Sequence, residues 1–335
     1  MISNLTLGTQ TFGMDTSKNE SFKILDLCFI NDIKSIDTAE RYPFPEKEET
    51  VGLTETIIGE WITFNKIKRK ELTLSTKVTG RSENGWKAFG SGRLDKDRIK
   101  SSLYNSLDRL KVDYVDIFYF HWPDRYTNTF ERKYYEPDPD PFFIKFEEQC
   151  EALIELFKEG LIKSIGLSNE TPWGIMSFQN ILKSKGFRVN YLQNEFSFIN
   201  RDFERSHSEI ALRENINLIS YSPLSFGLLT GKYSNSFNIK SQNRLIKYSA
   251  FSKRYNTKPK YELANLYYNL CKDEGIDPIH TAIKYGLTKS FLKSVIIGVK
   301  SFSQLQYLLR GDYKNLDLKT IKKIENELYK ILNKY

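Results

Sequence analysis

The stretch EEQCEALIELFKEG at residues 147–160 runs directly into LIKSIGLSN at residues 161–169. Apolar residues in the first part are spaced by three and four, as on one face of an amphipathic helix, and Gly160 is a typical helix stop. The second part is a short apolar run of the kind that forms a buried strand. A helix that leads into a buried strand is the repeating unit of a parallel α/β fold.

Further segments along the chain have the same strand character, and amphipathic segments such as 97–112 and 172–186 lie between most of them. Together with 162–168, the predicted strands are 4–9, 33–38, 72–77, 114–121, 189–195, 217–222 and 294–299. This alternation predicts an α/β fold, a (β/α)8 TIM barrel. No low-complexity linker divides residues 1–335, so we expect a single domain, with the Pro-rich segment 136–141 as a loop inside one unit.

Composition and charge narrow the class of protein. The chain has 335 residues, is 40% hydrophobic and carries 50 basic and 42 acidic residues, for a net charge of +8. The two signs are interleaved, which argues against nucleic-acid binding but is compatible with an anionic small ligand. The N-terminus does not resemble a signal peptide, and no apolar run approaches the roughly 18 to 20 residues that span a bilayer. We therefore expect a cytoplasmic protein with no membrane partner.

Cysteine and glycine patterns exclude several kinds of site. Cys28, Cys150 and Cys271 are far apart and form no CxxC motif, so we expect reduced, mostly buried thiols. The sequence contains no GxGxxG after a strand and no GxxxxGK[ST], which disfavours a doubly wound dinucleotide fold and a P-loop. His207 and His280 show no metal-ligand spacing, so we expect no metal.

Polar residues stand at the ends of most predicted strands. In a barrel of this kind the C-terminal ends of the strands converge on one face, where the chemistry takes place. Each residue alone has an ordinary structural explanation, such as a helix cap or a buried histidine, but their joint placement predicts an active site. The strand-end residues are Gly8, Thr9, Asp37, Lys77, His121, Ser168, Asn169, Gln193, Tyr221, Ser222 and Gly298.

The stretch SIDTAERYPF at residues 35–44 adds Tyr42 to this set. A lysine ammonium beside a tyrosine hydroxyl favours the phenolate, so Lys77 is expected to lower the pKa of Tyr42. Such a phenol is a usable proton donor near neutral pH. Asp37 is expected to keep Lys77 charged and oriented.

At these residues the sequence resembles the aldo-keto reductase superfamily, nearly end to end and in the family order. The motifs HWPDR (121–125), SNETPWGIM (168–176) and RLIKYSAFSKRY (244–255) are most similar to the bacterial Tas-like branch. The matching motifs are GTQTFG (8–13), IDTAERY (36–42), LSTKV (74–78), DIFYFHWPD (116–124), IGLSNE (165–170), LQNEFS (192–197), ISYSPLSFGLLTGKY (219–233) and IIGVKSFSQL (296–305).

The resemblance implies an NAD(P)H-dependent carbonyl reductase that takes a small-molecule aldehyde or ketone as substrate. Its catalytic tetrad falls on Asp37, Tyr42, Lys77 and His121, with Tyr42 as general acid and His121 orienting the carbonyl. The implied cofactor is NADPH or NADP+, with NADH less favoured. Its carboxamide would be held by Ser168, Asn169 and Gln193, and its ring would stack on Tyr221.

The remaining cofactor contacts implied by the resemblance lie in the late motifs and at the first strand. The cofactor would also be bordered by the ends of two strands, with Gly8 and Thr9 at the end of the first and Gly298 at the end of the eighth. The pyrophosphate would be covered by Ser222, Pro223, Leu224, Gly227, Leu228, Gly231 and Lys232. The 2′-phosphate would meet Lys300, Ser301 and Gln304, with Arg244 and Arg254 as alternative cations. Few residues precede the first strand, so the N-terminal bottom hairpin of the family is expected to be truncated or absent.

Aromatic residues in two loops predict a substrate pocket for flat apolar carbonyl compounds. They are Trp86, Phe89, Trp122 and Tyr126, with Tyr134 and Tyr135 nearby, although any of them could instead pack a loop against the barrel. Two alternatives to a reductase stay open. One is a cofactor-binding regulatory or interaction protein on the same scaffold, and the other is a different barrel enzyme that acts on phosphorylated sugars. The sequence predicts neither the physiological substrate nor the oligomeric state.

Overall fold

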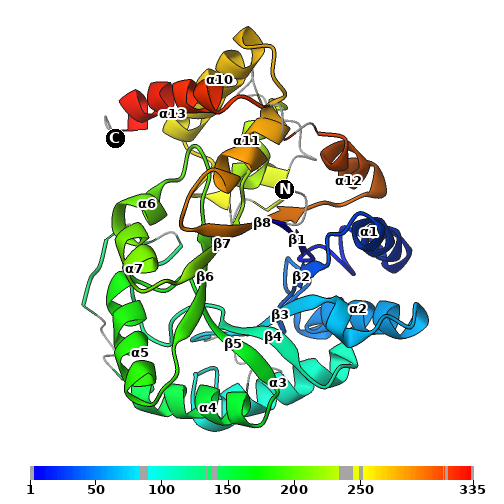
Figure 1. The fold of residues 1–335 in the computed structure, drawn as a ribbon, viewed down its shortest axis with the longest axis vertical. Helices are drawn as coiled ribbons and strands as arrows, with labels where there is room; N and C mark the ends of the chain where they lie inside the picture. The colour runs from blue at the N-terminus through cyan, green and yellow to red at the C-terminus, as the bar shows by residue number, and fades with distance from the viewer. Residues whose placement is uncertain are drawn as a thin grey trace.

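The computed structural model describes residues 4–82, 90–130, 132, 134–137, 142–233, 244–248, 252–311, 313 and 316–332. Eight parallel strands pair in chain order and close into a barrel (Figure 1). The predicted (β/α)8 barrel is therefore confirmed. The strands are β1 (Leu5–Gly8), β2 (Ser35–Asp37), β3 (Thr73–Val78), β4 (Val115–Phe120), β5 (Ile162–Ser168), β6 (Val189–Glu195), β7 (Asn217–Tyr221) and β8 (Leu292–Gly298).

The barrel closes where the first strand meets the last. β1 pairs in parallel with β8 from Leu5 opposite Val295 to Gly8 opposite Gly298. At this seam the Thr6 hydroxyl lies 2.7 Å from the hydroxyl of Ser294 and donates to that of Ser35 at 3.0 Å. The closed sheet brings the C-terminal ends of all eight strands to one rim.

Every predicted strand is present, and the ends differ from the prediction by at most two residues. Figure 1 shows the helices packed around the outside of the barrel. They are α1 (Lys18–Ile30), α2 (Leu53–Phe64), α3 (Lys96–Leu110), α4 (Phe146–Lys158), α5 (Pro172–Ser184), α6 (Asp202–Ser206), α7 (Ser208–Arg213), α8 (Arg244–Lys247), α10 (Lys258–Asp273), α11 (Pro278–Leu287), α12 (Phe302–Leu309) and α13 (Leu318–Leu332), with short 3₁₀ helices at Glu48–Thr50, Arg69–Glu71 and Ser225–Thr230.

Side-chain caps set several helix starts. Asp95 accepts a hydrogen bond from the backbone N–H of Arg98 at 2.8 Å, and Asp277 does the same for His280 at 2.8 Å. Such caps satisfy backbone donors that the first helical turn leaves without partners. Among the described residues, which begin at Asn4, no hairpin precedes β1, and no described helix is long and apolar enough to cross a membrane.

Apolar side chains fill two regions. The larger lies between the sheet and the helices, and the smaller lies inside the barrel, where Ile117, Tyr119, Ile219 and Ile296 pack together. The three cysteines are free and buried, as predicted, and burial raises the pKa of each thiol to about 12. They are Cys28, Cys150 and Cys271.

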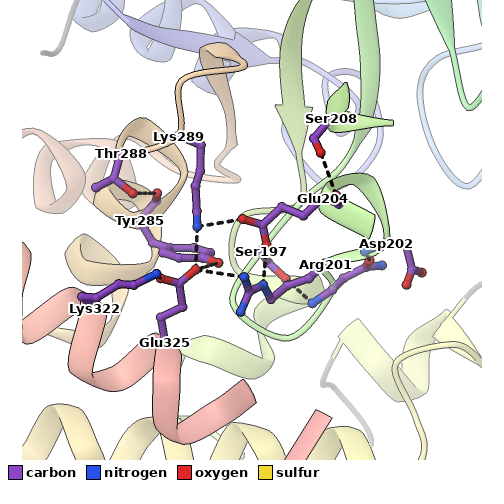
Figure 2. Close-up of polar contacts among 11 residues, drawn as sticks. Ser197, Arg201, Asp202, Glu204, Ser208, Tyr285, Thr288, Lys289, Lys322 and Glu325 are labelled. Atoms are coloured by element: carbon purple, nitrogen blue, oxygen red, sulfur yellow. Dashed lines mark hydrogen bonds and ion pairs between the residues drawn. The ribbon is translucent and has the colours of Figure 1, made fainter. Parts of the chain in front are cut away.

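The last helix, α13, is held to the barrel by a buried carboxylate (Figure 2). Glu325 accepts hydrogen bonds from Tyr285 Oη at 3.0 Å, Lys289 Nζ at 2.5 Å and Lys322 Nζ at 2.6 Å, and it also pairs with Arg201 Nη2 at 3.0 Å. Burial favours the neutral acid, but the hydrogen bonds from the two lysines lower the pKa of Glu325 to about 2. The carboxylate is therefore charged and joins α13, α11 and the start of α6.

Candidate active site

A cavity of about 1130 Å³ opens at the C-terminal ends of the barrel strands. Most of the predicted site residues line it, from elements far apart in the sequence. Those that do are Gly8, Thr9, Asp37, Tyr42, His121, Trp122, Ser168, Asn169, Gln193, Tyr221, Ser222, Pro223, Leu224, Gly227, Lys232, Arg254, Gly298, Lys300 and Gln304. The strand-end pattern thus brings these residues to one cavity.

A buried ion pair lies at the base of this cavity. Lys77 Nζ donates to Asp37 Oδ2 at 2.6 Å and to the carbonyl oxygen of Thr38 at 2.6 Å. The other oxygen of Asp37, Oδ1, accepts from Ser75 Oγ at 2.7 Å and from Gln193 Nε2 at 2.8 Å. The Asp37 carboxylate on β2 is thus held by donors from two strands, β3 and β6, and it holds the lysine in turn.

Tyr42 lies beside this pair, with Lys77 Nζ 5.4 Å from the centroid of its ring. The prediction that the pKa of Tyr42 is lowered is wrong for the free protein. Burial and then the charge of Asp37 raise that pKa well above its usual value. The physical reason is that burial disfavours the charged phenolate, and Asp37, which lies 2.6 Å from the ammonium of Lys77, adds a negative charge nearby. Burial also lowers the pKa of Lys77, against the opposing effect of Asp37.

The imidazole of His121 faces the Tyr42 ring, with ring centroids 5.8 Å apart and planes at 77°. Burial, followed by the charges of Lys77 and Arg41, holds the pKa of His121 well below its usual range, so the ring is neutral. Its Nδ1 atom is buried and has no hydrogen-bond partner among the residues that the structure describes. The two side chains that could contact a reacting carbonyl are therefore a protonated phenol and a neutral imidazole.

An amide-rich wall faces this pair. Tyr221 Oη donates to Asn169 Oδ1 at 2.6 Å, and Asn169 Nδ2 donates to the backbone oxygen of His121 at 2.9 Å. Ser168 Oγ donates to the backbone oxygen of Gln193 at 2.9 Å. Asn169 has φ of 54°, a left-handed conformation that asparagine tolerates better than most residues. This wall is linked to the Asp37–Lys77 pair through Gln193, which donates to Asp37.

Three residues predicted to contact the cofactor lie outside the cavity lining. Leu228 is buried in the core, and Gly231 leaves room for Tyr268, whose ring atom would lie 2.4 Å from an added Cβ. Ser301 caps α12 by accepting from the backbone N–H of Gln304 at 3.3 Å. Of Arg244 only the backbone of its helix is described.

The predicted phosphate cations have protein partners in the structure. Lys300 Nζ pairs with Asp15, which also accepts from Lys247 Nζ at 2.6 Å and Tyr248 Oη at 2.7 Å. Arg254 pairs with Glu195 at 3.3 Å. Sequence reasoning missed Asp15, because a single carboxylate in the loop after β1 has no recognisable motif.

The predicted aromatic pocket is found in part. Trp122 lines the cavity, but Tyr126 does not, and its ring instead stacks with Arg132. Tyr134 and Tyr135 are 80% and 65% exposed. Trp86 and Phe89 lie outside the described residues. Other lining residues were not predicted from the sequence, although the first two belong to the stretch 35–44; they are Arg41, Phe44, Glu46 and Phe130.

The model of the Aldo/keto reductase family matches residues 4–327 of the sequence. The chain belongs to this family. This aldo/keto reductase is 33% identical to Protein tas of Escherichia coli (strain K12) over 326 residues, which are 97% of this chain and 93% of that protein. It is 28% identical to Uncharacterized oxidoreductase YrpG of Bacillus subtilis (strain 168), over 98% of this chain and 92% of that one. Pyridoxal reductase, chloroplastic, of Arabidopsis thaliana is 29% identical over 69% of this chain and 56% of its own.

Members of the aldo/keto reductase family generally use NAD(P)H, and the cavity fits such a group. A Cβ added at Gly298 would meet no atom within 4 Å, so the backbone there faces open space. Gly227 has φ of 96°, a conformation that glycine adopts without strain, and it also lines the cavity. Within the described ranges, no group of three or more His, Cys, Asp or Glu residues is placed to hold a metal ion.

Proposed function

We propose that this aldo/keto reductase reduces aldehydes or ketones to alcohols with NADPH, and that Tyr42 donates the proton. The observation that carries the proposal is the meeting of a protonated phenol and a neutral imidazole in one cavity, beside a buried Asp37–Lys77 pair. Ser168, Asn169 and Gln193 would hold the nicotinamide carboxamide, and Tyr221 would support its ring. The bound cofactor supplies the hydride.

The residues of the chain handle the proton and the carbonyl oxygen. His121, being neutral, donates one N–H to the carbonyl oxygen and positions it near Tyr42. The raised pKa keeps the Tyr42 phenol protonated until negative charge develops on that oxygen. The proton then passes to the oxygen, and Lys77 stabilises the phenolate that remains.

NADPH is favoured over NADH because cations line the late part of the cavity, among them Lys232, Arg254 and Lys300. Two observations favour an aromatic aldehyde as the substrate. Trp122, Phe44 and Phe130 line the cavity, and the chain is similar to a pyridoxal reductase. The complete tetrad argues against a purely regulatory protein on this scaffold. Membership of the family argues against a barrel enzyme of another kind that acts on phosphorylated sugars.

The proposal is tested by titrating NADPH with the protein and following nicotinamide fluorescence, then by measuring NADPH consumption with a panel of aldehydes that includes pyridoxal and benzaldehyde. We expect binding, followed by consumption that Tyr42→Phe abolishes. Tyr104→Phe, at an exposed position on α3, is the matched control and should retain full activity. NADPH binding with no consumption of cofactor for any carbonyl compound would favour the regulatory alternative.

A further inference from the structure

A second ion pair lies in the same cavity as Tyr42 and His121. The Nε and Nη2 atoms of Arg41 both contact Glu46 Oε2, and the two side chains are only 12% and 17% exposed. Both residues line the cavity. Arg41 precedes Tyr42 in the chain, so the pair shares this cavity with the proposed proton donor.

The surroundings of this pair are aromatic. The guanidinium carbon of Arg41 lies 4.4 Å from the centroid of the Trp122 ring, and Phe130 meets that ring edge-on at 5.9 Å. Trp122 donates its indole N–H to the backbone oxygen of Arg81 at 2.8 Å, so that donor is already used by the protein. A flat ring held against this wall would therefore find its polar contact at the ion pair.

One oxygen of the pair is available to a ligand. Both contacts from Arg41 fall on Oε2 of Glu46, and no residue in the described part of the chain donates to Oε1. A carboxylate oxygen accepts hydrogen bonds and cannot donate them when ionised. A largely buried acceptor gains most from a ligand O–H or N–H, and it repels a second anion brought close to it.

We propose that Glu46 determines substrate specificity: it selects uncharged planar aldehydes or ketones whose ring carries a hydroxyl or similar donor, and it disfavours those that carry a carboxylate. Arg41 is a positioning residue, which aims Glu46 and braces Trp122. This inference rests on the proposed carbonyl reduction at Tyr42.

The test compares kcat/KM for benzaldehyde and its 3- and 4-substituted hydroxy, methoxy and carboxylate derivatives. In the wild-type protein the better hydroxy isomer should exceed its methoxy counterpart by about tenfold, the value of one charge-assisted hydrogen bond. Glu46→Gln should reduce this ratio and raise kcat/KM for the carboxylate derivatives, relative to benzaldehyde, by about tenfold. Arg41→Met should instead lower kcat/KM for the carboxylate derivatives further, because Glu46 then has no counter-charge.

The control is Glu209→Gln, which breaks an exposed ion pair with Arg213 on α7 and should leave all ratios unchanged. The proposal is overturned if Glu46→Gln keeps both substrate ratios within about twofold of the wild-type values.

A second measurement does not depend on turnover. Dissociation constants of the corresponding benzyl alcohols, with NADP+ present, are taken from quenching of tryptophan fluorescence in the wild-type protein and in Glu46→Gln. The same shift in the ratio of hydroxy to carboxylate compounds is expected. If these compounds bind with that shift but no aldehyde is reduced, the ligand preference inferred for Glu46 holds, while the proposed function fails. If none binds the wild-type protein at millimolar concentration, or the ratio does not shift, the inference fails.

Discussion

Two buried carboxylates of this barrel, Asp37 and Glu325, have similar surroundings and different uses. Each is 4% exposed, and each is surrounded by several donors, including a lysine within 2.6 Å. Around Glu325 the donors Arg201, Tyr285 and Lys289 come from elements that the carboxylate joins together (Figure 2). Around Asp37 the donors come from β3 and, across the barrel, from β6, beneath a cavity.

The two clusters differ in whether a polar atom beside the carboxylate is left without a hydrogen-bond partner. Beside Asp37, the Nδ1 atom of His121 has no partner in the described part of the chain, and both His121 and Tyr42 face the cavity. The donors around Glu325, in contrast, serve to hold α13 in place. A buried charge with many hydrogen bonds is thus not by itself the mark of an active site. Unsatisfied polar atoms that face a cavity beside the charge are the more specific sign.

The largest expected effect is on the Asp37 side. Tyr42→Phe removes the only proposed proton donor and should lower kcat by about 10³-fold, within the range measured for general acids. Cofactor affinity should stay nearly unchanged, because the phenol contacts the carbonyl rather than the proposed nicotinamide site. Steady-state kinetics and NADPH fluorescence give the two values. Full turnover in this variant would remove Tyr42 from the mechanism.

Lys77→Met should affect both turnover and folding. It leaves Asp37 buried without its counter-charge, and loss of one member of a buried pair costs about 3 to 5 kcal/mol. Urea denaturation measures the free energy of unfolding, and kcat should fall because the Tyr42 phenolate is no longer stabilised. The double variant with Asp37→Asn should recover stability but not turnover. Recovery of both would show that Lys77 has only a structural role.

Glu325→Gln should reduce stability and leave catalysis intact. Glu325 has a folded-state pKa lowered from 4.5 to about 2, so its contribution is fully present above pH 4.5 and is lost as pH falls towards 2. That contribution is about 3 kcal/mol. Denaturation at pH 7 and pH 3 should show a large deficit that shrinks at the lower pH. Glu327→Gln, at a partly exposed position on α13, is the control. A loss of kcat/KM in Glu325→Gln would contradict the division between the two clusters.

The smallest expected effect concerns Asp15, a third carboxylate, one of whose donors, Lys300, lines the cavity. If Lys300 contacts the 2′-phosphate, Lys300→Ala should weaken NADPH binding by about tenfold and leave the affinity for NADH unchanged. Asp15→Asn should tighten NADPH binding, because it releases Lys300 from its present partner. Dissociation constants at low and high salt test this, since the contact is partly exposed and screened by ions. Equal weakening of both cofactors by Lys300→Ala would assign that residue to the fold.

Most of the barrel could be predicted from the sequence, because buried parallel strands and amphipathic helices leave a strong periodic signal. Strand ends were also predictable, and they bring Asp37, His121 and Gln193 together without any knowledge of side-chain directions. The tetrad depended on resemblance to a family as well as on position.

The remaining features of the site depend on side-chain geometry, which the sequence does not show. The sign of the Tyr42 pKa shift was predicted wrongly because the sequence shows neither how deeply the phenol is buried nor how close Asp37 lies to it. The contacts of Glu46 with Arg41 and of Asp15 with Lys300 join side chains whose charges alone predict no partner. Loop aromatics such as Tyr134 could not be separated into lining and exposed residues, because composition does not fix the path of a loop.

The pairing of β1 with β8 also bears on how the protein is made. Leu5 pairs with Val295, which is synthesised much later. One edge of β1 therefore stays unpaired until nearly the whole chain has left the ribosome. At roughly 5 to 20 residues per second, that interval is on the order of 15 to 60 seconds. Unpaired strand edges invite association between chains. The newly made protein is thus expected to depend on chaperones through most of its synthesis, and to lose that dependence once the eighth strand docks.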